Sequence, residues 1–227
     1  EHRDIVPALG HNYKEKSRAL TKATTSKDGK RTATYICTRT GCKATYTKTL
    51  QTYYKASNIK LNKTAYTYNG KVQKPSVTVK DSKGKALKST DYKIDYPKGM
   101  KNVGKYTVKV SLKGNYSGSK SMTYNINPKG TSVSKVTAAK KGFKVTWKKQ
   151  TTQTTGYQVQ YSTSSKFKSA KTVTVSKNKT TSKSVGKLSS KKKYYVRVRT
   201  YKTVKIGGKS VKLYSGWSKA KSVTTKK

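Results

Sequence analysis

The residue types with the widest chemistry lie near the start of the chain: Cys37 and Cys42 are its only cysteines, and His2 and His11 its only histidines. In an oxidising compartment, two cysteines separated by four residues most simply form a local disulfide, which we expect here. The alternative is zinc held by His11, Cys37 and Cys42, with His2 as the remaining candidate ligand. Nucleophilic catalysis ranks last, because a base must lie beside the cysteine and only two histidines exist.

Carboxylate chemistry is confined to the first part of the chain. All seven acidic residues precede residue 96: Glu1, Asp4, Glu15, Asp28, Asp81, Asp91 and Asp95. Glycosidase-type acid pairs, carboxylate-held metals and Asp-oriented triads are therefore excluded from more than half of the chain. The sequence also lacks a Gly-rich phosphate loop, a Gly-x-Ser-x-Gly elbow and a His-Glu-x-x-His motif. We predict that the chain is not an enzyme and needs no cofactor.

Positive charge dominates the surface chemistry. The chain carries 54 Lys and Arg against 7 Asp and Glu, a formal net charge of +47. Such a net charge destabilises the folded state through repulsion between like charges, and it attracts polyanions. Because nearly all of the cations are lysines, which lack the bidentate fork of arginine, we expect diffuse attraction. Its densest cluster is Lys191, Lys192 and Lys193.

Several small β-rich cores, joined by turns, would position these residues. Only 31% of the 227 residues are hydrophobic, which suits two or three small domains better than one large core. Apolar residues recur with a period of two over 77–79, 92–96, 106–112 and 122–126, which is typical of half-buried strands. A short hairpin is predicted around the cysteine pair. No run of about 18 apolar residues exists, so we predict no membrane span.

Residues 1–52 resemble a repeat of surface proteins from Gram-positive anaerobes. His11 matches the histidine that opens the family's unit, and Asp28-Gly29 matches its acidic-Gly turn. Thr25 stands where the family's first cysteine would be, and the closing Cys37 and Cys42 are four residues apart instead of two. The resemblance implies a small hairpin-rich module at the start of a fragment of something longer.

Residues 53–128 resemble a small bacterial immunoglobulin-like module. The pattern runs from YNGK at residues 68–71 through NVGKYTV at 102–108 to GNYSG at 114–118. Pro128-Lys129-Gly130 then breaks the strand pattern and marks a boundary.

Residues 129–227 are similar to a fibronectin type III domain. Trp147 in KVTWKK matches the family's core tryptophan, and Leu188 with Tyr194 match its tyrosine corner. Together, the three resemblances imply an all-β fold: tandem immunoglobulin-like and fibronectin type III sandwiches behind a small Cys-containing module.

One constellation in the last segment could bind a ligand. In YYVRVRTY the valines face one side of a strand, so Arg197, Arg199 and Tyr201 face the other together with Tyr195. Trp217 follows in YSGWS, which resembles the Trp-Ser element of cytokine-receptor fibronectin domains, where arginines stack on the indole. A structural ladder is the simpler interpretation, and a ligand platform is the alternative.

The resemblances and the charge lead to three functional hypotheses. The first is a secreted, cell-surface or wall-associated binding module that attaches electrostatically to acidic glycans, mucin chains, cell-wall polyanions or host surface proteins. The second is a structural stalk that presents a distant domain. The third, nucleic-acid binding, ranks lowest because the 18 tyrosines fall at strand positions that a core needs. We expect a monomeric fragment.

Overall fold

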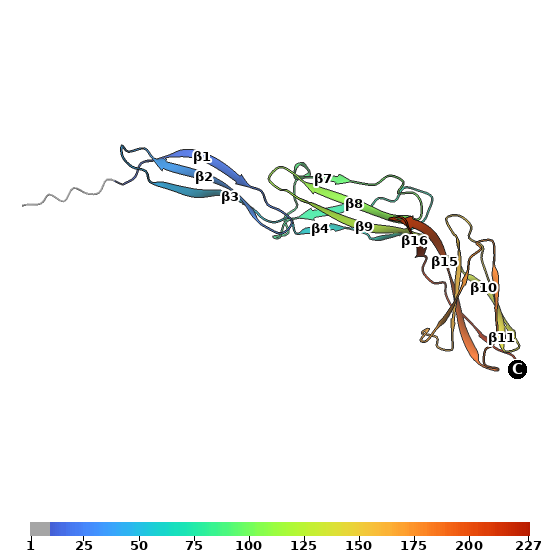
Figure 1. Ribbon diagram of the computed structural model, residues 1–227. Helices are drawn as coiled ribbons and strands as arrows, with labels where there is room; N and C mark the ends of the chain where they lie inside the picture. Colours follow the sequence, from blue (N-terminus) through green and yellow to red (C-terminus); the bar gives the residue numbers. More distant parts are fainter. Residues whose placement is uncertain (1–9) are drawn as a thin grey trace, which may run out of the picture. The chain divides into compact units, whose positions relative to one another are not determined.

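The computed structural model describes residues 10–227, and in that part of the chain every regular element except one 3-10 turn is a β-strand (Figure 1). The prediction of an all-β fold is confirmed. His2, the remaining candidate zinc ligand, lies outside the described residues.

The first sheet contains three antiparallel strands in chain order: β1 (Tyr13–Thr21), β2 (Gly29–Cys37) and β3 (Thr45–Tyr53). Both of its faces are largely exposed, because Thr, Lys, Arg and other polar residues occupy most strand positions and only a few residues such as Ala33 are buried. Cross-strand pairs must replace a core here. Tyr35 and Tyr46 are direct partners in the register, and their rings stack with centroids 5.0 Å apart.

The open end of this sheet is fixed to the segment that follows. Ala23 forms an isolated parallel bridge with Tyr116 and donates its N–H to the carbonyl of Asn115 at 3.0 Å. Ala23 and Tyr53 share one buried cluster with Ile59, which belongs to the next sheet. The sheet therefore continues into a hydrophobic core at this end.

The middle segment has two sheets and the 3-10 turn η1 (Ser89–Asp91). Strand β4 (Asn58–Leu61) pairs antiparallel with β6 (Val77–Lys80). The second sheet has the order β5-β9-β8-β7, with these bounds: β5 (Ala65–Thr67), β7 (Tyr92–Asp95), β8 (Gly104–Leu112) and β9 (Ser119–Asn127). The predicted period of two is seen in β8, where Val108, Val110 and Leu112 are buried and Lys109 is exposed.

The C-terminal segment is a two-sheet sandwich. One sheet has the order β10-β11-β14, with these bounds: β10 (Val133–Ala139), β11 (Gly142–Trp147) and β14 (Ser182–Val185). The other has the order β13-β12-β15-β16, and β17 also pairs with β15. Its strands are β12 (Gly156–Ser162), β13 (Lys171–Val175), β15 (Lys193–Ile206), β16 (Lys209–Tyr214) and β17 (Lys221–Thr224).

Alternate residues of the two sheets fill the sandwich core. Phe143, Val145 and Trp147 from β11 pack with Tyr157 and Val159 from β12, and Trp147 is the core residue that the sequence predicted. The predicted tyrosine corner is confirmed as well: the buried Tyr194 hydroxyl accepts a hydrogen bond from the N–H of Ser189 at 3.3 Å.

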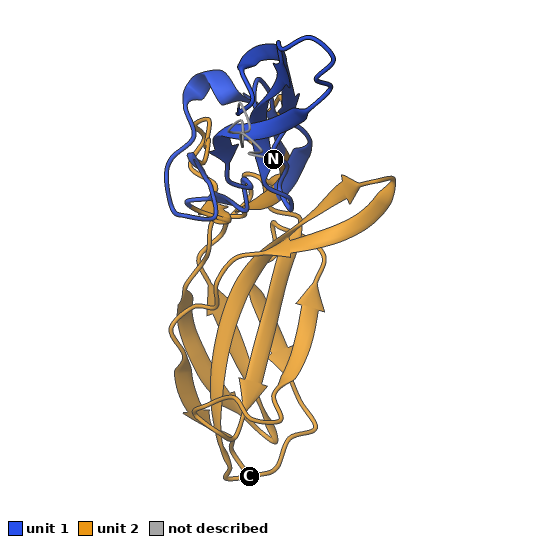
Figure 2. Cartoon of the chain, turned by 90° about the vertical axis from the view of Figure 1, so that its left-hand side faces the viewer, with its two compact units in different colours: residues 1–62, 76–96, 108–122 blue, residues 63–75, 97–107, 123–227 orange. Residues whose placement is uncertain are grey.

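The chain divides into two compact units (Figure 2): unit 1 holds residues 1–62, 76–96 and 108–122, and unit 2 holds residues 63–75, 97–107 and 123–227. Strands β8 and β9 run through both units. The division into modules 1–52, 53–128 and 129–227 stays a prediction. Nothing between residues 10 and 227 forms a helix long and apolar enough to cross a membrane.

Candidate functional site

Strand pairing in unit 2 sets the two arginines of the predicted ladder beside two glutamines. Arg197 on β15 lies opposite Gln160 on β12, and Arg199 lies opposite Gln158. Arg197 Nε donates to Gln160 Oε1 at 2.7 Å. Arg199 donates to Gln158 Oε1 from Nε at 2.9 Å and from Nη2 at 2.7 Å. Both guanidinium planes are thereby held in place.

Aromatic rings stack on these guanidinium groups. Arg197 lies 3.8 Å from the ring centroid of Phe167 and 4.8 Å from that of Trp217. Arg199 lies 4.3 Å from the Trp217 ring and 3.9 Å from the Tyr214 ring. Burial lowers the pKa of both arginines from the usual value, yet a guanidinium keeps its charge in proteins. We call Phe167, Arg197, Trp217, Arg199 and Tyr214 the Arg-aromatic ladder.

The ladder leaves little aromatic surface for a ligand. Trp217 is half-buried, and both arginines contact its ring. Tyr201, named with it from the sequence, is only 2% exposed and packs over Gly156, where a Cβ atom would lie 3.0 Å from the tyrosine ring. The sequence had placed Tyr201 on the correct face of the strand, but it could not show that Tyr201 is covered.

Lys191, Lys192 and Lys193 lie at the turn that begins β15, and all three are exposed. Their backbone is fixed by Thr225: Lys191 N–H donates to its carbonyl and Lys192 N–H to its hydroxyl, both at 3.1 Å. The Lys193 ammonium lies 5.5 Å from the Tyr195 ring centroid. The cluster therefore offers charge on a rigid turn, without a cavity of its own.

The cysteine pair of unit 1 lies at the hairpin end between β2 and β3. Because Tyr13 pairs with Cys37, the residues before Tyr13 lie beside those after Cys37. His11 Nδ1 is 3.3 Å from Cys42 Sγ, and the ligand atoms of His11, Cys37 and Cys42 all lie within 4.8 Å of one another. Both cysteines are free thiols in the structure.

Hydrogen bonding makes the two thiols unequal. The pKa of Cys37 is lowered from 9.0 to about 6, chiefly by a hydrogen bond from Cys42, with smaller contributions from the Arg39 backbone and from His11. The pKa of Cys42 is raised in turn, mainly by its hydrogen bond with Cys37. A thiolate beside a thiol is the reactive form of a cysteine pair, and the same three residues supply three of the four ligands of a tetrahedral zinc site. The disulfide and the zinc alternative both stay predictions.

A cavity of about 470 Å³ in unit 1 was missed by reasoning from the sequence. Tyr53, Asp81, Asp91 and Tyr116 contribute to its lining. Asp81 and Asp91 are two of the few carboxylates of the chain, and their scarcity was a signal that the sequence offered. The sequence could not show that they lie near tyrosines from other segments, because that depends on tertiary folding.

Ion pairs are rare among residues 10–227. Arg18 pairs with Glu15 at 2.8 Å and Lys93 with Asp95 at 2.8 Å, and no other pair is formed in that part of the chain. Nearly all of the cations counted in the sequence are therefore left without an internal counter-charge.

Comparisons with known proteins identify one part of the chain. The family model "Fibronectin type III domain" matches residues 127–215. The comparison with curated proteins found no match. Among solved structures, the chain is similar to the FN1-FN3 domains of chicken CNTN1, with 15% identity over 87% of this chain and 78% of that one, at a TM-score of 0.38.

Two further solved structures are similar at this low level. A segment of two fibronectin type III domains from chicken tenascin has 14% identity, covers 94% of this chain and 99% of that one, and has a TM-score of 0.32. A beta-1,2-glucanase from Parabacteroides distasonis has 13% identity over 54% of this chain and 18% of that one, also at 0.32. Residues 127–215, which hold the Trp147 core, the tyrosine corner and most of the Arg-aromatic ladder, are recognised as a fibronectin type III domain.

Proposed function

We propose that this chain is a non-catalytic binding module of a larger extracellular protein, attached electrostatically to acidic polysaccharide. Fibronectin type III domains are commonly structural or binding modules of multidomain proteins, they are common in extracellular proteins, and their fold is typically non-catalytic. The observation that carries the proposal is the unpaired charge: +47 in the sequence, with two internal ion pairs among residues 10–227.

The distribution of the charge favours a diffuse surface over a single pocket. The two arginines best suited to bidentate recognition are held by Gln158 and Gln160 inside the ladder. Most of the remaining exposed cations are lysines, and a lysine acts as a mobile point charge without directional preference. Many weak contacts to a polyanion release counterions, so binding must weaken steeply as salt is added.

Heparin and uncharged dextran, each titrated between about 0.05 M and 0.2 M NaCl, test this proposal. We expect heparin to bind with an affinity that falls by more than tenfold over that range, and any binding of dextran to be weaker and insensitive to salt. Heparin binding that ignores salt would overturn the proposal.

Two triple variants then separate diffuse from local binding. Replacing Lys191, Lys192 and Lys193 by Gln is expected to weaken heparin binding only several-fold. A matched control replaces three exposed lysines on or after the β15–β16 hairpin, Lys205, Lys209 and Lys219, and should weaken binding by a similar factor. Loss of binding in one triple alone would point to a discrete site.

A spacer is the second candidate, favoured by the way the first sheet is fixed to the following core through Ala23 and Tyr116. A rigid joint of this kind suits a segment that holds other domains at a distance. Absence of heparin binding at about 0.05 M NaCl, where electrostatic attraction is strong, would favour this alternative.

A further inference from the structure

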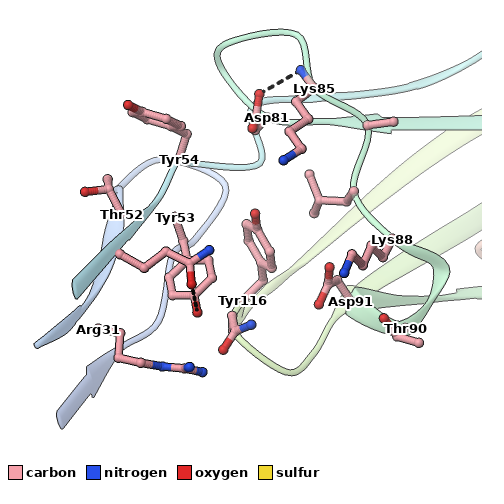
Figure 3. Close-up of a pocket in the computed structure, with 14 residues that line it drawn as sticks. Arg31, Thr52, Tyr53, Tyr54, Asp81, Lys85, Lys88, Thr90, Asp91 and Tyr116 are labelled. Atoms are coloured by element: carbon pink, nitrogen blue, oxygen red, sulfur yellow. Dashed lines mark hydrogen bonds between the residues drawn. The ribbon is translucent and has the colours of Figure 1, made fainter. Parts of the chain in front are cut away.

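The cavity of unit 1 lies where the first sheet meets the following core (Figure 3). Its walls come from β2, the end of β3, the turn at residues 81–88, η1 and the turn before β9. The volume of about 470 Å³ lies within the range of about 300 to 1,000 Å³ that is typical of small-molecule sites. Segments far apart in the sequence thus build one concave surface inside a single compact unit.

The cavity is held open by buried, hydrogen-bonded backbone. Asn115 O accepts from Ala23 N–H at 3.0 Å, and Ala23 O accepts from Ser117 N–H at 2.8 Å. Tyr53 and Tyr116 meet edge to face, with centroids 6.1 Å apart. Asp81 Oδ1 accepts hydrogen bonds from the backbone N–H groups of Lys83 and Lys85, both at 2.9 Å, and so fixes the turn at residues 81–85. A preformed wall lowers the entropy that a ligand must overcome on binding.

Two polar groups at this surface have no partner within residues 10–227. Tyr116 is 8% exposed, and its hydroxyl, which points into the cavity in Figure 3, forms no hydrogen bond in that part of the chain. The carboxylate of Asp91 accepts none either, although its backbone is bonded to Lys88 and Lys113. Burial, with Asp91 and Asp81 nearby, raises the pKa of Tyr116, so its hydroxyl stays protonated and available as a donor.

The charges that line the cavity are nearly balanced, unlike those of the chain as a whole. Asp81 and Asp91 face Arg31, Lys85 and Lys88. A polyanion meets carboxylates here and gains less than elsewhere on the surface. An uncharged molecule rich in hydroxyl groups can use the carboxylates and the cations together. Its hydroxyls donate to Asp91 and accept from the lysine and arginine side chains, while its apolar face lies against a tyrosine ring.

We propose that this cavity binds an uncharged sugar of one or two rings, with the Tyr116 hydroxyl and the Asp91 carboxylate as its hydrogen-bonding anchors and Tyr53 and Tyr116 as its apolar wall. The site is independent of the proposed attachment to acidic polysaccharide. It uses other residues, and because its ligand carries no charge, its affinity does not depend on salt.

Calorimetric titration with cellobiose, maltose, lactose and N,N′-diacetylchitobiose in about 0.5 M NaCl, where long-range charge effects are screened, tests the proposal. We expect at least one disaccharide to bind with a Kd of about 1 mM or tighter. Tyr116→Phe and Asp91→Asn should each weaken that binding by about tenfold or more. The first removes the hydroxyl donor, the second replaces one carboxylate acceptor by an NH2 donor, and both leave the shape unchanged.

Tyr66→Phe is the matched control, since Tyr66 belongs to unit 2 and lies outside the cavity; it should bind the sugar as the wild type does. Melting curves and heparin binding at low salt should be the same for all three variants, which separates this site from the polyanion surface. If no disaccharide binds at about 10 mM, or if Tyr116→Phe and Asp91→Asn bind like the wild type, the cavity is not a sugar site.

Discussion

The buried tyrosine hydroxyls differ in the number of backbone groups with which they form hydrogen bonds. The sequence singled out Tyr194 in the tyrosine corner, and its hydroxyl accepts one hydrogen bond at 3.3 Å. Tyr157, which is fully buried, does more: its hydroxyl accepts from Gln150 N–H at 2.8 Å and lies 2.9 Å from Gln150 O and 2.8 Å from Asn178 O, which share its single proton. Tyr157 therefore ties two loops together at one end of the sandwich.

Chemical unfolding should rank three variants of this core. Tyr157→Phe is expected to cost about 1–3 kcal/mol because buried backbone groups lose their partner, and Tyr194→Phe about 0.5–1.5 kcal/mol because its bond is single and long. Trp147→Ala should cost most, about 3–5 kcal/mol, since it empties the centre of a small core. A larger loss for Tyr194→Phe than for Tyr157→Phe would mean that the corner is the main anchor of the sandwich.

The lowered pKa of Cys37 predicts its reactivity in the reduced protein. Because only the thiolate reacts, alkylation of Cys37 should rise through about pH 6 and level off near neutrality, whereas an ordinary thiol keeps rising towards pH 9. Cys42→Ala removes the main hydrogen bond and should move the profile back to higher pH. Cys42→Ser keeps a donor and should move it less; identical profiles for the two variants would contradict this assignment.

The state of the same pair in the isolated, unreduced protein is decided by its mass. We expect Cys37 and Cys42 to be oxidised to each other, which makes the chain two hydrogen atoms lighter than after reduction. Two thiols that react at once would contradict the disulfide, and bound zinc in a native spectrum would instead favour the site formed with His11.

At the scale of elements, the Arg-aromatic ladder joins β15 to the chain around Trp217 by stacking. Trp217→Ala removes the ring that both arginines contact, and each cation–π contact contributes roughly 0.5–2 kcal/mol. We expect a loss of about 1–3 kcal/mol in thermal unfolding and unchanged heparin binding. Lys219→Ala, two residues away and exposed, is the control and should be neutral. Lost heparin binding in a stably folded Trp217→Ala protein would restore the ligand-platform hypothesis.

At the scale of the whole molecule, unbalanced charge must lower stability. With +47 and two internal ion pairs among residues 10–227, folding brings like charges together. Raising NaCl from about 0.01 M to 1 M shortens the screening length from about 30 Å to 3 Å, so the melting temperature should rise by several degrees. An unchanged or lower melting temperature would show that the lysines lie far enough apart to avoid mutual repulsion.

Local rules made much of this protein predictable from its sequence. Alternation with a period of two located the strands and their buried faces, because a pleated strand points successive side chains to opposite sides. The same rule set Arg197, Arg199 and Tyr201 on one face, and the charge followed from composition alone. The prediction that the chain is not an enzyme rested on residue types and motifs that its sequence lacks.

Only the tertiary structure decided what lies beside these faces. Burial of Tyr201 over Gly156, the glutamine partners of the ladder arginines and the approach of His11 to the cysteines all depend on strand register. The cavity around Tyr116 depends on even more, since its walls come from five segments and its unpartnered groups become visible only when those segments meet. The sequence determines composition and the alternation of side chains along each strand, because both are local properties. A binding site forms from segments that are distant in the sequence, and only tertiary packing brings those segments together.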